Sequence, residues 1–431
     1  MALGGGNFLT QNKVLPGSYI NFVSASSSNA NISDRGYAAI ACEMDWGKEN
    51  EIFAVTAEEF LTDSMSIFGY AYTSEKLKGM RDIFINAQTV YFYRLNKGTQ
   101  ASCELGKARY GGTRGNDISI SVISSEEQYT VETSIDGSVI DSQTVSSAAE
   151  LEDNEFIIFD KEAVLTSTVK TNLLGGDNGS VSESAHQEFL DKLESISFNN
   201  LGCLSDDETI KKLYAQYTQT MRDTYGVKFQ TVIHDYAAEY EGVINVANDS
   251  TDSEEEKYGL VWWVTGACAG CNINESLTNK LYDGEYGVFT QYKQSELEEG
   301  IESGCFMLHK NGDDIRVLDD INSFTEFKDG KDKNFGENQV IRLLDQIGND
   351  IAVMFNTYYL GKVQNNNAGR TAFWNDIVTY NKELLMLNVI EDFEPDDVIV
   401  ELGNDKKTVS VTNPVTPVCA MAKLYMTVIV Y

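Results

Sequence analysis

The pattern of the chain changes at residues 173–179, which read LLGGDNG. Glycine and asparagine tolerate positive φ angles, so this segment predicts a turn. Between residues 100 and 172, short segments alternate apolar and polar side chains with a period of two, as strands do, and Asp136-Gly137 between two such segments predicts a hairpin. After the turn, apolar residues recur every three or four positions, as in amphipathic helices. The turn therefore separates a small all-β module from a region that contains helices.

Strand-like and helix-like segments alternate after this turn. A helix is predicted around 189–196, and a second follows residues 205–208, SDDE, which fit a capping box. Strands are predicted at 227–234 and 242–247, before a helix from 254 through Gly266. This alternation is typical of an α/β domain. The earlier segment 36–95, which ends in the strand-like run TVYFYRL, is expected to join the same sheet, so the β module would be an insertion into that domain.

The last quarter of the chain predicts a further domain. Apolar spacing indicates a long helix at 340–355 and another at 372–387, and two strands are predicted at 398–402 and 408–411. The predicted fold class is a multi-domain α+β/α/β protein with a central α/β domain, an inserted all-β module, a C-terminal α+β domain and strand-forming terminal arms. The predicted boundaries are an N-terminal arm at 1–30, the first part of the central domain at 31–99, the inserted module at 100–172, the second part of the central domain at 173–330, the C-terminal domain at 331–418 and a C-terminal strand arm at 419–431.

Both ends of the sequence carry strand-like segments. Residues 424–431, LYMTVIVY, are apolar on both alternating faces, so both faces and at least one edge of such a strand should be covered. Residues 19–23, YINFV, have a similar character. These strands could pair within their own domain or with a neighbouring subunit, and the residues alone do not decide between the two. The residues assigned to the arms are Tyr19, Ile20, Phe22, Val23, Leu424, Tyr425, Met426, Val428, Ile429 and Val430.

The charge of the chain limits the classes of partner. Its 33 basic and 66 acidic residues give a net charge of −33, which would repel the backbone of a nucleic acid. The charge is uneven: residues 331–431 hold nine basic and thirteen acidic residues, or −4, and leave −29 for the first 330. This weaker charge would suit a surface that faces another protein, but chance variation together with a larger buried fraction would explain it equally well. No run approaches the ~20 apolar residues of a membrane span, and without a secretion signal the chain is expected to fold in a cytoplasm.

Candidate catalytic and metal-binding residues are few. The three histidines lie in different segments, and no hydrolase, metalloprotease or phosphate-loop motif is present. Cys268 and Cys271 have the spacing of a redox or zinc pair, but no second pair follows, and their small neighbours favour tight helix packing. We therefore predict no enzyme activity, no catalytic residues, no cofactor and no metal site.

Longer segments of the sequence resemble a known family. They include the start MALGGGNFLTQNKVLPGSYINFVSA, the segments ARYGGTRGNDISI, SLTNKLYDGEY and NQVIRLLDQIGNDIAVMFNTYYLGKV, and the end AMAKLYMTVIVY. The chain resembles the phage tail sheath family, in the branch found in phages and phage-tail-like bacteriocins of Gram-positive bacteria. Each motif alone is weak, but together they span the chain in the family's order.

The resemblance implies an architecture and a mechanical function. Sheath subunits stack as hexameric rings around an inner tube, exchange terminal strands with neighbours, and contract to drive the tube through a cell envelope. The implied partners are further copies of the chain, the inner tail-tube protein, and baseplate and tail-terminator proteins, with neither direct nucleic-acid binding nor membrane insertion. The protein would belong to a virion tail sheath or bacteriocin particle assembled in a bacterial cytoplasm. The C-terminal domain would face the tube and the β module the outer surface. The alternative is a non-contractile structural lattice or tail-tube component.

Overall fold

The computed structural model describes residues 32–125, 128–253 and 256–431. The chain forms two compact units. Of the described residues, one unit comprises Asp34–Asn349 and Pro417–Tyr431, and the other comprises Asp350–Thr416 with residues 32 and 33. The predicted mixed α/β, multi-domain class is confirmed, with several sheets and eight α-helices in the described part of the chain.

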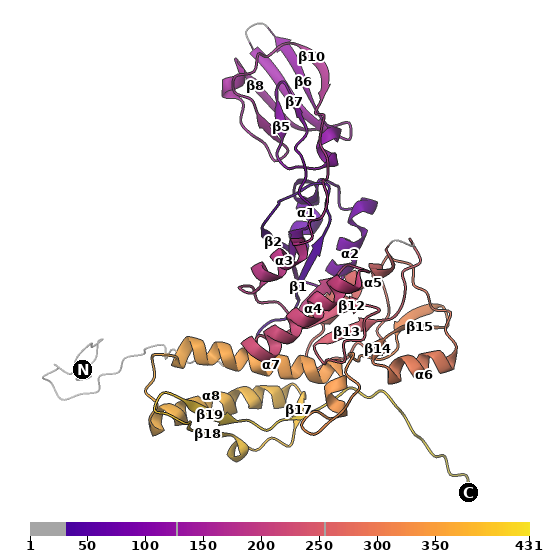
Figure 1. Cartoon of the computed structure of the whole chain (residues 1–431), viewed down its shortest axis with the longest axis vertical. Coiled ribbons are helices and arrows are strands. Elements are labelled where there is room, and N and C mark those ends of the chain that lie inside the picture. The colour runs from indigo at the N-terminus through magenta and orange to yellow at the C-terminus, as the bar shows by residue number, and fades with distance from the viewer. Residues whose placement is uncertain (1–31, 126–127, 254–255) are drawn as a thin grey trace, which may run out of the picture. The chain divides into compact units, whose positions relative to one another are not determined.

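A seven-stranded sheet forms the core of the first unit (Figure 1). Its strand order is β14-β13-β12-β11-β1-β3-β2, and all neighbours are parallel except the terminal pair of β3 and β2. Strands that are parallel and buried on both faces need helices above and below the sheet. The strands are β1 (Tyr37–Cys42), β2 (Ile52–Thr56), β3 (Thr89–Arg94), β11 (Asn200–Cys203), β12 (Gln230–His234), β13 (Val243–Val246) and β14 (Cys305–Phe306).

Helices cover both faces of this sheet. Alternate residues of β1 point to opposite faces: Ile40 packs with α1, α2 and α5, whereas Ala39 packs with α3 and α4. The helices α5 and α2 approach closely because each carries glycine where they meet: Gly79 of α2 lies against Trp262, and a Cβ on Gly266 of α5 would lie 2.2 Å from the carbonyl oxygen of Ile83. Besides the start of α7 (Asn338–Met354), the helices of this unit are α1 (Ala57–Phe68), α2 (Lys78–Phe84), α3 (Ala185–Leu193), α4 (Glu208–Thr220), α5 (Leu260–Gly270) and α6 (Gln294–Glu302).

Capping side chains explain where some of these helices begin. Thr56 and Glu59 form a capping box at the start of α1, and their side chains accept each other's backbone N–H groups. The capping box predicted at residues 205–208 is wrong: Asp207 is the N-cap of α4, and its carboxylate accepts the N–H groups of Thr209 and Ile210. The nearer carboxylate takes the position that the serine was expected to fill, because Asp caps as well as Ser.

A four-stranded antiparallel sheet forms the core of the β module that lies between β3 and β11 in the sequence. The hairpin predicted at Asp136-Gly137 is confirmed, with φ angles of 51° and 80° that fit a turn of type I′. The order is β10-β6-β7-β8, and a second sheet has the order β4-β5-β9. The strands are β4 (Ser102–Cys103), β5 (Gly106–Ala108), β6 (Ile118–Ser125), β7 (Gln128–Ile135), β8 (Ser138–Val145), β9 (Ile157–Phe159) and β10 (Thr168–Asn172).

Polar side chains join the β module to the core of its unit. Arg114, 4% exposed, donates to the carbonyl oxygen of Gly69 at 2.7 Å and pairs with Asp136 in the β7–β8 turn. Where the chain leaves and re-enters the core on either side of the module, the side chain of Asn96 donates to the carbonyl oxygens of Met44 and Asn178 at 2.7 and 2.8 Å. The module is therefore tied to the sheet by buried hydrogen bonds as well as by the chain itself.

The rest of the chain contains two long helices and several short strands. In the second unit, α8 packs against β18, which pairs antiparallel with β19, and the indole of Trp374 donates to the carbonyl oxygen of Val398 at 2.8 Å. The boundary between the two units falls at residues 349–350, inside α7. The remaining elements are β15 (Leu308–Asn311), β16 (Asp314–Val317), α7 (Asn338–Met354), α8 (Asn367–Met386), β17 (Ile390–Glu391), β18 (Ile399–Leu402), β19 (Val409–Thr412) and β20 (Thr416–Pro417).

Candidate assembly surfaces

The C-terminal arm, residues 419–431, lies beyond β20 and contains no helix or strand in the single chain (Figure 1). Its base contacts the start of α7, where the N–H of Ala420 donates to Oε1 of Gln339 at 2.9 Å. The strand predicted at 424–431 is thus not formed within the chain. A strand requires a hydrogen-bonding neighbour, and no strand of the described residues takes that place.

The arm exposes an unusual amount of apolar surface. Each of its six predicted contact residues is at least two-thirds exposed, from 68% for Ile429 to 92% for Tyr425. Covering a side chain of this kind contributes about 1.5–3 kcal/mol. Contiguous exposed apolar surface of this extent marks an interaction site. The exposed residues are Leu424, Tyr425, Met426, Val428, Ile429 and Val430.

The base of the arm lies beside a group of carboxylates. Lys423 is the only charged side chain of residues 418–431. Burial, together with the negative charges of Asp319 and Asp320, raises the pKa of Glu337 to about 7, and Lys423 acts in the opposite direction. The ionisation of Glu337 is therefore coupled to the position of the arm's lysine.

The β18–β19 hairpin offers open edges in the second unit. Among the described residues, no further strand pairs with either edge of this two-stranded sheet, so both edges can accept one. Ile399 and Leu402 on β18 are 50% and 51% exposed. A cavity of about 310 Å³ beside β18 is lined by residues of α8 and β18, among them Trp374 and Val400. This hairpin combines free backbone groups with apolar side chains that a strand could cover.

The N-terminal arm cannot be placed in the same way. Its predicted contact residues, Tyr19, Ile20, Phe22 and Val23, lie outside the described residues. Their assignment to an intersubunit strand stays a prediction.

The cysteine pair is part of the packing of α5. Cys268 and Cys271 are buried, and burial raises the pKa of each thiol. Their backbone carbonyl oxygens accept hydrogen bonds from the guanidinium of Arg35 at 3.2 and 2.8 Å, which satisfies the end of the helix. In residues 32–125, 128–253 and 256–431, no three His, Cys, Asp or Glu side chains gather closely enough to hold a metal ion.

His186 and His234 lie apart from each other and contact different side chains. Burial lowers the pKa of His186 to about 4, and its Nδ1 lies 3.0 Å from the hydroxyl of Tyr214. His234 lies between the carboxylates of Asp206 and Asp249, at 3.0 and 3.1 Å. Both histidines are buried and engaged with neighbouring side chains.

Two buried ion pairs were not foreseen from the sequence. Arg222 pairs with Asp345 through two hydrogen bonds of 2.5 and 2.8 Å, and Arg342 pairs with Asp320 at 2.8 Å. Both pairs connect the start of α7 to the rest of its unit. The partners are 123 and 22 residues apart in the sequence, and no local pattern links such residues.

Three family models match successive parts of the chain. They are the Tail sheath protein Gp18 domain III N-terminal region at residues 35–95, the Phage tail sheath protein central domain at 179–323 and the Phage tail sheath C-terminal domain at 330–431. The crystal structure of a sheath tail protein from Desulfitobacterium hafniense is 31% identical, with a TM-score of 0.83 over 93% of this chain and 96% of that chain. The chain belongs to the phage tail sheath family.

Two other proteins extend this similarity. Phage-like element PBSX protein XkdK of Bacillus subtilis (strain 168) is 28% identical over 99% of both chains. The helical sheath of the anti-feeding prophage in its contracted state is 11% identical, with a TM-score of 0.57 over 96% of this chain and 99% of that chain, which shows a common fold. The sheath family is structural. Among the helices formed by the described residues, none combines the length and apolar character that crossing a membrane requires.

Proposed function

We propose that this chain is the structural subunit of a contractile tail sheath, polymerising around an inner tube by exchanging terminal strands between subunits. The observation that carries the proposal is the C-terminal arm, which exposes apolar side chains on both alternating faces and has no strand partner among the described residues of its own chain. In an assembly, a neighbour's sheet would supply the missing hydrogen bonds and cover both faces.

The β18–β19 hairpin is the proposed acceptor of an arm from a neighbouring subunit. Its open edges would extend to a larger sheet, and its half-exposed Ile399 and Leu402 would be covered by the incoming strand. Exchanged strands would tether neighbours during a change of lattice, because main-chain hydrogen bonds survive a rigid rotation of the domains. The domain that carries the hairpin, residues 331–418 as predicted, would face the tube with the low charge of the C-terminal region.

Contraction would convert an extended lattice into a shorter and wider one. Each additional 100 Å² of apolar surface buried between subunits contributes about 2.5 kcal/mol before the cost of ordering. No catalytic step, nucleotide or metal enters this proposal. The extended lattice must then be trapped kinetically until a trigger releases it.

Deleting residues 424–431 tests the proposal. We expect a folded, soluble chain that forms no sheath, because the deleted residues make no ladder within the described part of their own chain. Met426→Asp should act in the same way, since a charge would be forced into a paired strand. Met426→Leu is the matched control and should assemble normally. Sedimentation and electron microscopy measure the outcome, and normal tubes from the truncated chain would count against strand exchange.

Imaging before and after a trigger tests the mechanical part separately. A sheath shortens and widens, whereas a static lattice or a tail tube keeps its dimensions. Particles of constant length would contradict contraction but would leave the assembly proposal standing.

A further inference from the structure

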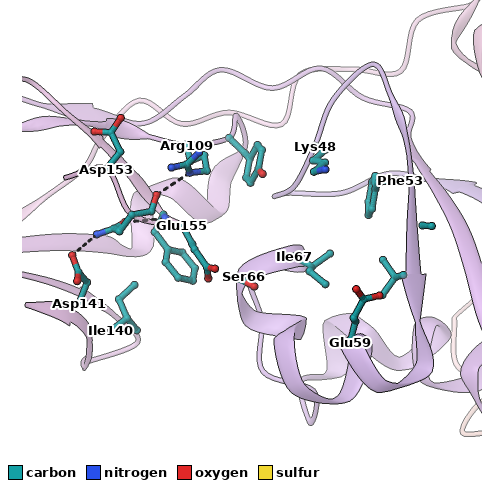
Figure 2. Close-up of a pocket in the computed structure, with 15 residues that line it drawn as sticks. Lys48, Phe53, Glu59, Ser66, Ile67, Arg109, Ile140, Asp141, Asp153 and Glu155 are labelled. Atoms are coloured by element: carbon teal, nitrogen blue, oxygen red, sulfur yellow. Dashed lines mark hydrogen bonds between the residues drawn. The ribbon is translucent and has the colours of Figure 1, made fainter.

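A second interaction surface lies between the β module and the edge of the central sheet. It is a cleft of about 690 Å³ within the first unit. Figure 2 shows its two walls: Asp141, Asp153 and Glu155 belong to the β module, whereas Phe53 and Glu59 belong to β2 and α1. The cleft is separate from the C-terminal arm and from the β18–β19 hairpin.

One wall of the cleft is the free edge of β2. This strand pairs with β3 on one side, and none of the described strands pairs with it on the other. The N–H of Ala57 donates to the carbonyl oxygen of Gln88 across the ladder at 2.9 Å. Since backbone groups alternate in direction along an antiparallel strand, Val55 and Phe53 also face β3, and Ala54 and Ile52 turn their N–H and C=O groups outward.

The outward backbone groups can form a ladder with an extended peptide. The next outward N–H, that of Thr56, is already taken by the carboxylate of Glu59 at 2.8 Å. Ala54 and Ile52 remain, and each presents one donor and one acceptor to a strand laid along the edge. Ala54 also lines the cleft, so these groups lie where a ligand can reach them.

The side chains of the cleft define the chemistry of the occupant. Ile67, Tyr110 and Ile140 provide apolar contacts. Four carboxylates and two cations line the cleft, for a net charge of −2. Both cations are engaged, since Lys48 pairs with Glu51 at 3.4 Å and Nε of Arg109 donates to the carbonyl oxygen of Asn154 at 2.8 Å. Three of the four carboxylates also have neighbours: Glu59 caps α1, Asp141 accepts a hydrogen bond from Asn154 at 2.9 Å, and Asp153 pairs with Lys161 at 3.4 Å. The acidic groups are Glu59, Asp141, Asp153 and Glu155.

We propose that this cleft accepts an extended, basic segment of another polypeptide, which adds to the edge of β2 as an eighth strand. Lysine or arginine side chains of that segment face the carboxylates, and the apolar residues between them contact Ile67 and Ile140. The C-terminal arm of a second copy fits this site less well, because it carries a single charge. The proposed occupant of the cleft is therefore a basic segment of a different protein and not the C-terminal arm of a second copy.

The probe is a fluorescent eight-residue peptide, capped at both ends, in which lysine alternates with valine or threonine. Binding to the unassembled full-length protein is measured by fluorescence anisotropy. We expect the lysine peptide to bind at least about tenfold more tightly than its glutamate counterpart, and more tightly than a peptide of the sequence LYMTVIVY. Glu155→Lys should weaken binding of the lysine peptide by about threefold to tenfold.

The backbone contact has its own test. Ala54→Pro removes an outward N–H but leaves the ladder to β3, and it should weaken binding by about tenfold. Val169→Pro, on the open strand β10 outside the cleft, is the control and should leave binding unchanged. Hydrogen exchange on the unaltered protein gives a readout that needs no variant: the peptide should slow exchange at Ala54 and Ile52. Equal binding of the lysine and glutamate peptides, stronger binding of the arm peptide, or unchanged exchange at both amides would each overturn the proposal.

Discussion

Two buried arginines hold the start of α7 in the first unit. Arg342 and Asp320 are each 1% exposed, and Asp320 also accepts the N–H of Leu277 at 3.0 Å. Arg222 meets both oxygens of Asp345 in the planar, two-bond arrangement that suits guanidinium and carboxylate. Breaking a buried pair leaves an uncompensated charge, so these contacts fix the position of α7 more than they add to stability.

The carboxyl group of Glu337, one residue before α7, provides a prediction at this scale. Its pKa is raised from 4.5 to about 7. Between these two pH values the folded protein therefore keeps a proton on Glu337 that the unfolded chain has released. The resulting stability is present below pH 4.5 and is lost as the pH rises to about 7. Glu337→Gln keeps the uncharged form and removes this loss. We expect the variant to gain about 1–3 kcal/mol relative to the parent between pH 5 and 8.

Urea unfolding of the unassembled parent and variant across that pH range measures the difference. Asp82, whose pKa burial raises to about 6, contributes a loss of the same sign in both proteins and so cancels in the comparison. A difference that stays constant from pH 5 to pH 8 would show that Glu337 does not titrate in this range.

At the scale of elements, Arg114 provides the clearest test of how the β module is held. Its guanidinium contacts the carbonyl oxygen of Gly69, after α1, and the carboxylates of Asp117 and Asp136 in the module. Arg114→Met removes these hydrogen bonds, and because both carboxylates are half exposed and can be hydrated, we expect a loss of about 1–3 kcal/mol. Hydrogen exchange should accelerate in residues 102–172 and remain slow in β1 and β3.

Lys107→Met is the control for that experiment. Lys107 lies exposed on β5, and its replacement removes a positive charge from the same module without breaking a buried contact. Equal acceleration in both variants would mean that loss of charge, rather than loss of the junction, loosens the module.

The elements also differ in how far the sequence determines them. The strand at β3, the β7–β8 turn and the helix at α7 follow local patterns and were predicted within a few residues. The cap of α4 was misassigned because Ser205, Asp206 and Asp207 compete within three positions. The pairing of Arg222 with Asp345 depends on tertiary distance, which residue periodicity does not encode. The arm at 424–431 has strand composition but receives no partner from the described part of its own chain, so its conformation depends on other molecules.

At the scale of the whole molecule, charge opposes the assembly that the apolar arm favours. Each copy carries a net charge of −33, of which −29 falls in the first 330 residues. Like charges on neighbouring copies repel each other within the electrostatic screening length. This length falls from about 10 Å at a salt concentration of 0.1 M to about 3 Å at 1 M. Covering apolar side chains does not depend on that screening and is strengthened by salts such as sulfate.

Raising the salt concentration from about 0.1 M to 1 M should therefore promote polymerisation of the purified chain, lowering its critical concentration by about tenfold or more. Light scattering and electron microscopy measure assembly at each salt concentration. The chain lacking residues 424–431 is the control: it should remain unassembled at every salt concentration, because screening removes repulsion but supplies no strand. Assembly of the truncated chain at high salt would show that general apolar contact is sufficient. Slower assembly of the full chain at high salt would show instead that opposite charges on neighbouring copies, rather than apolar strands, hold the lattice together.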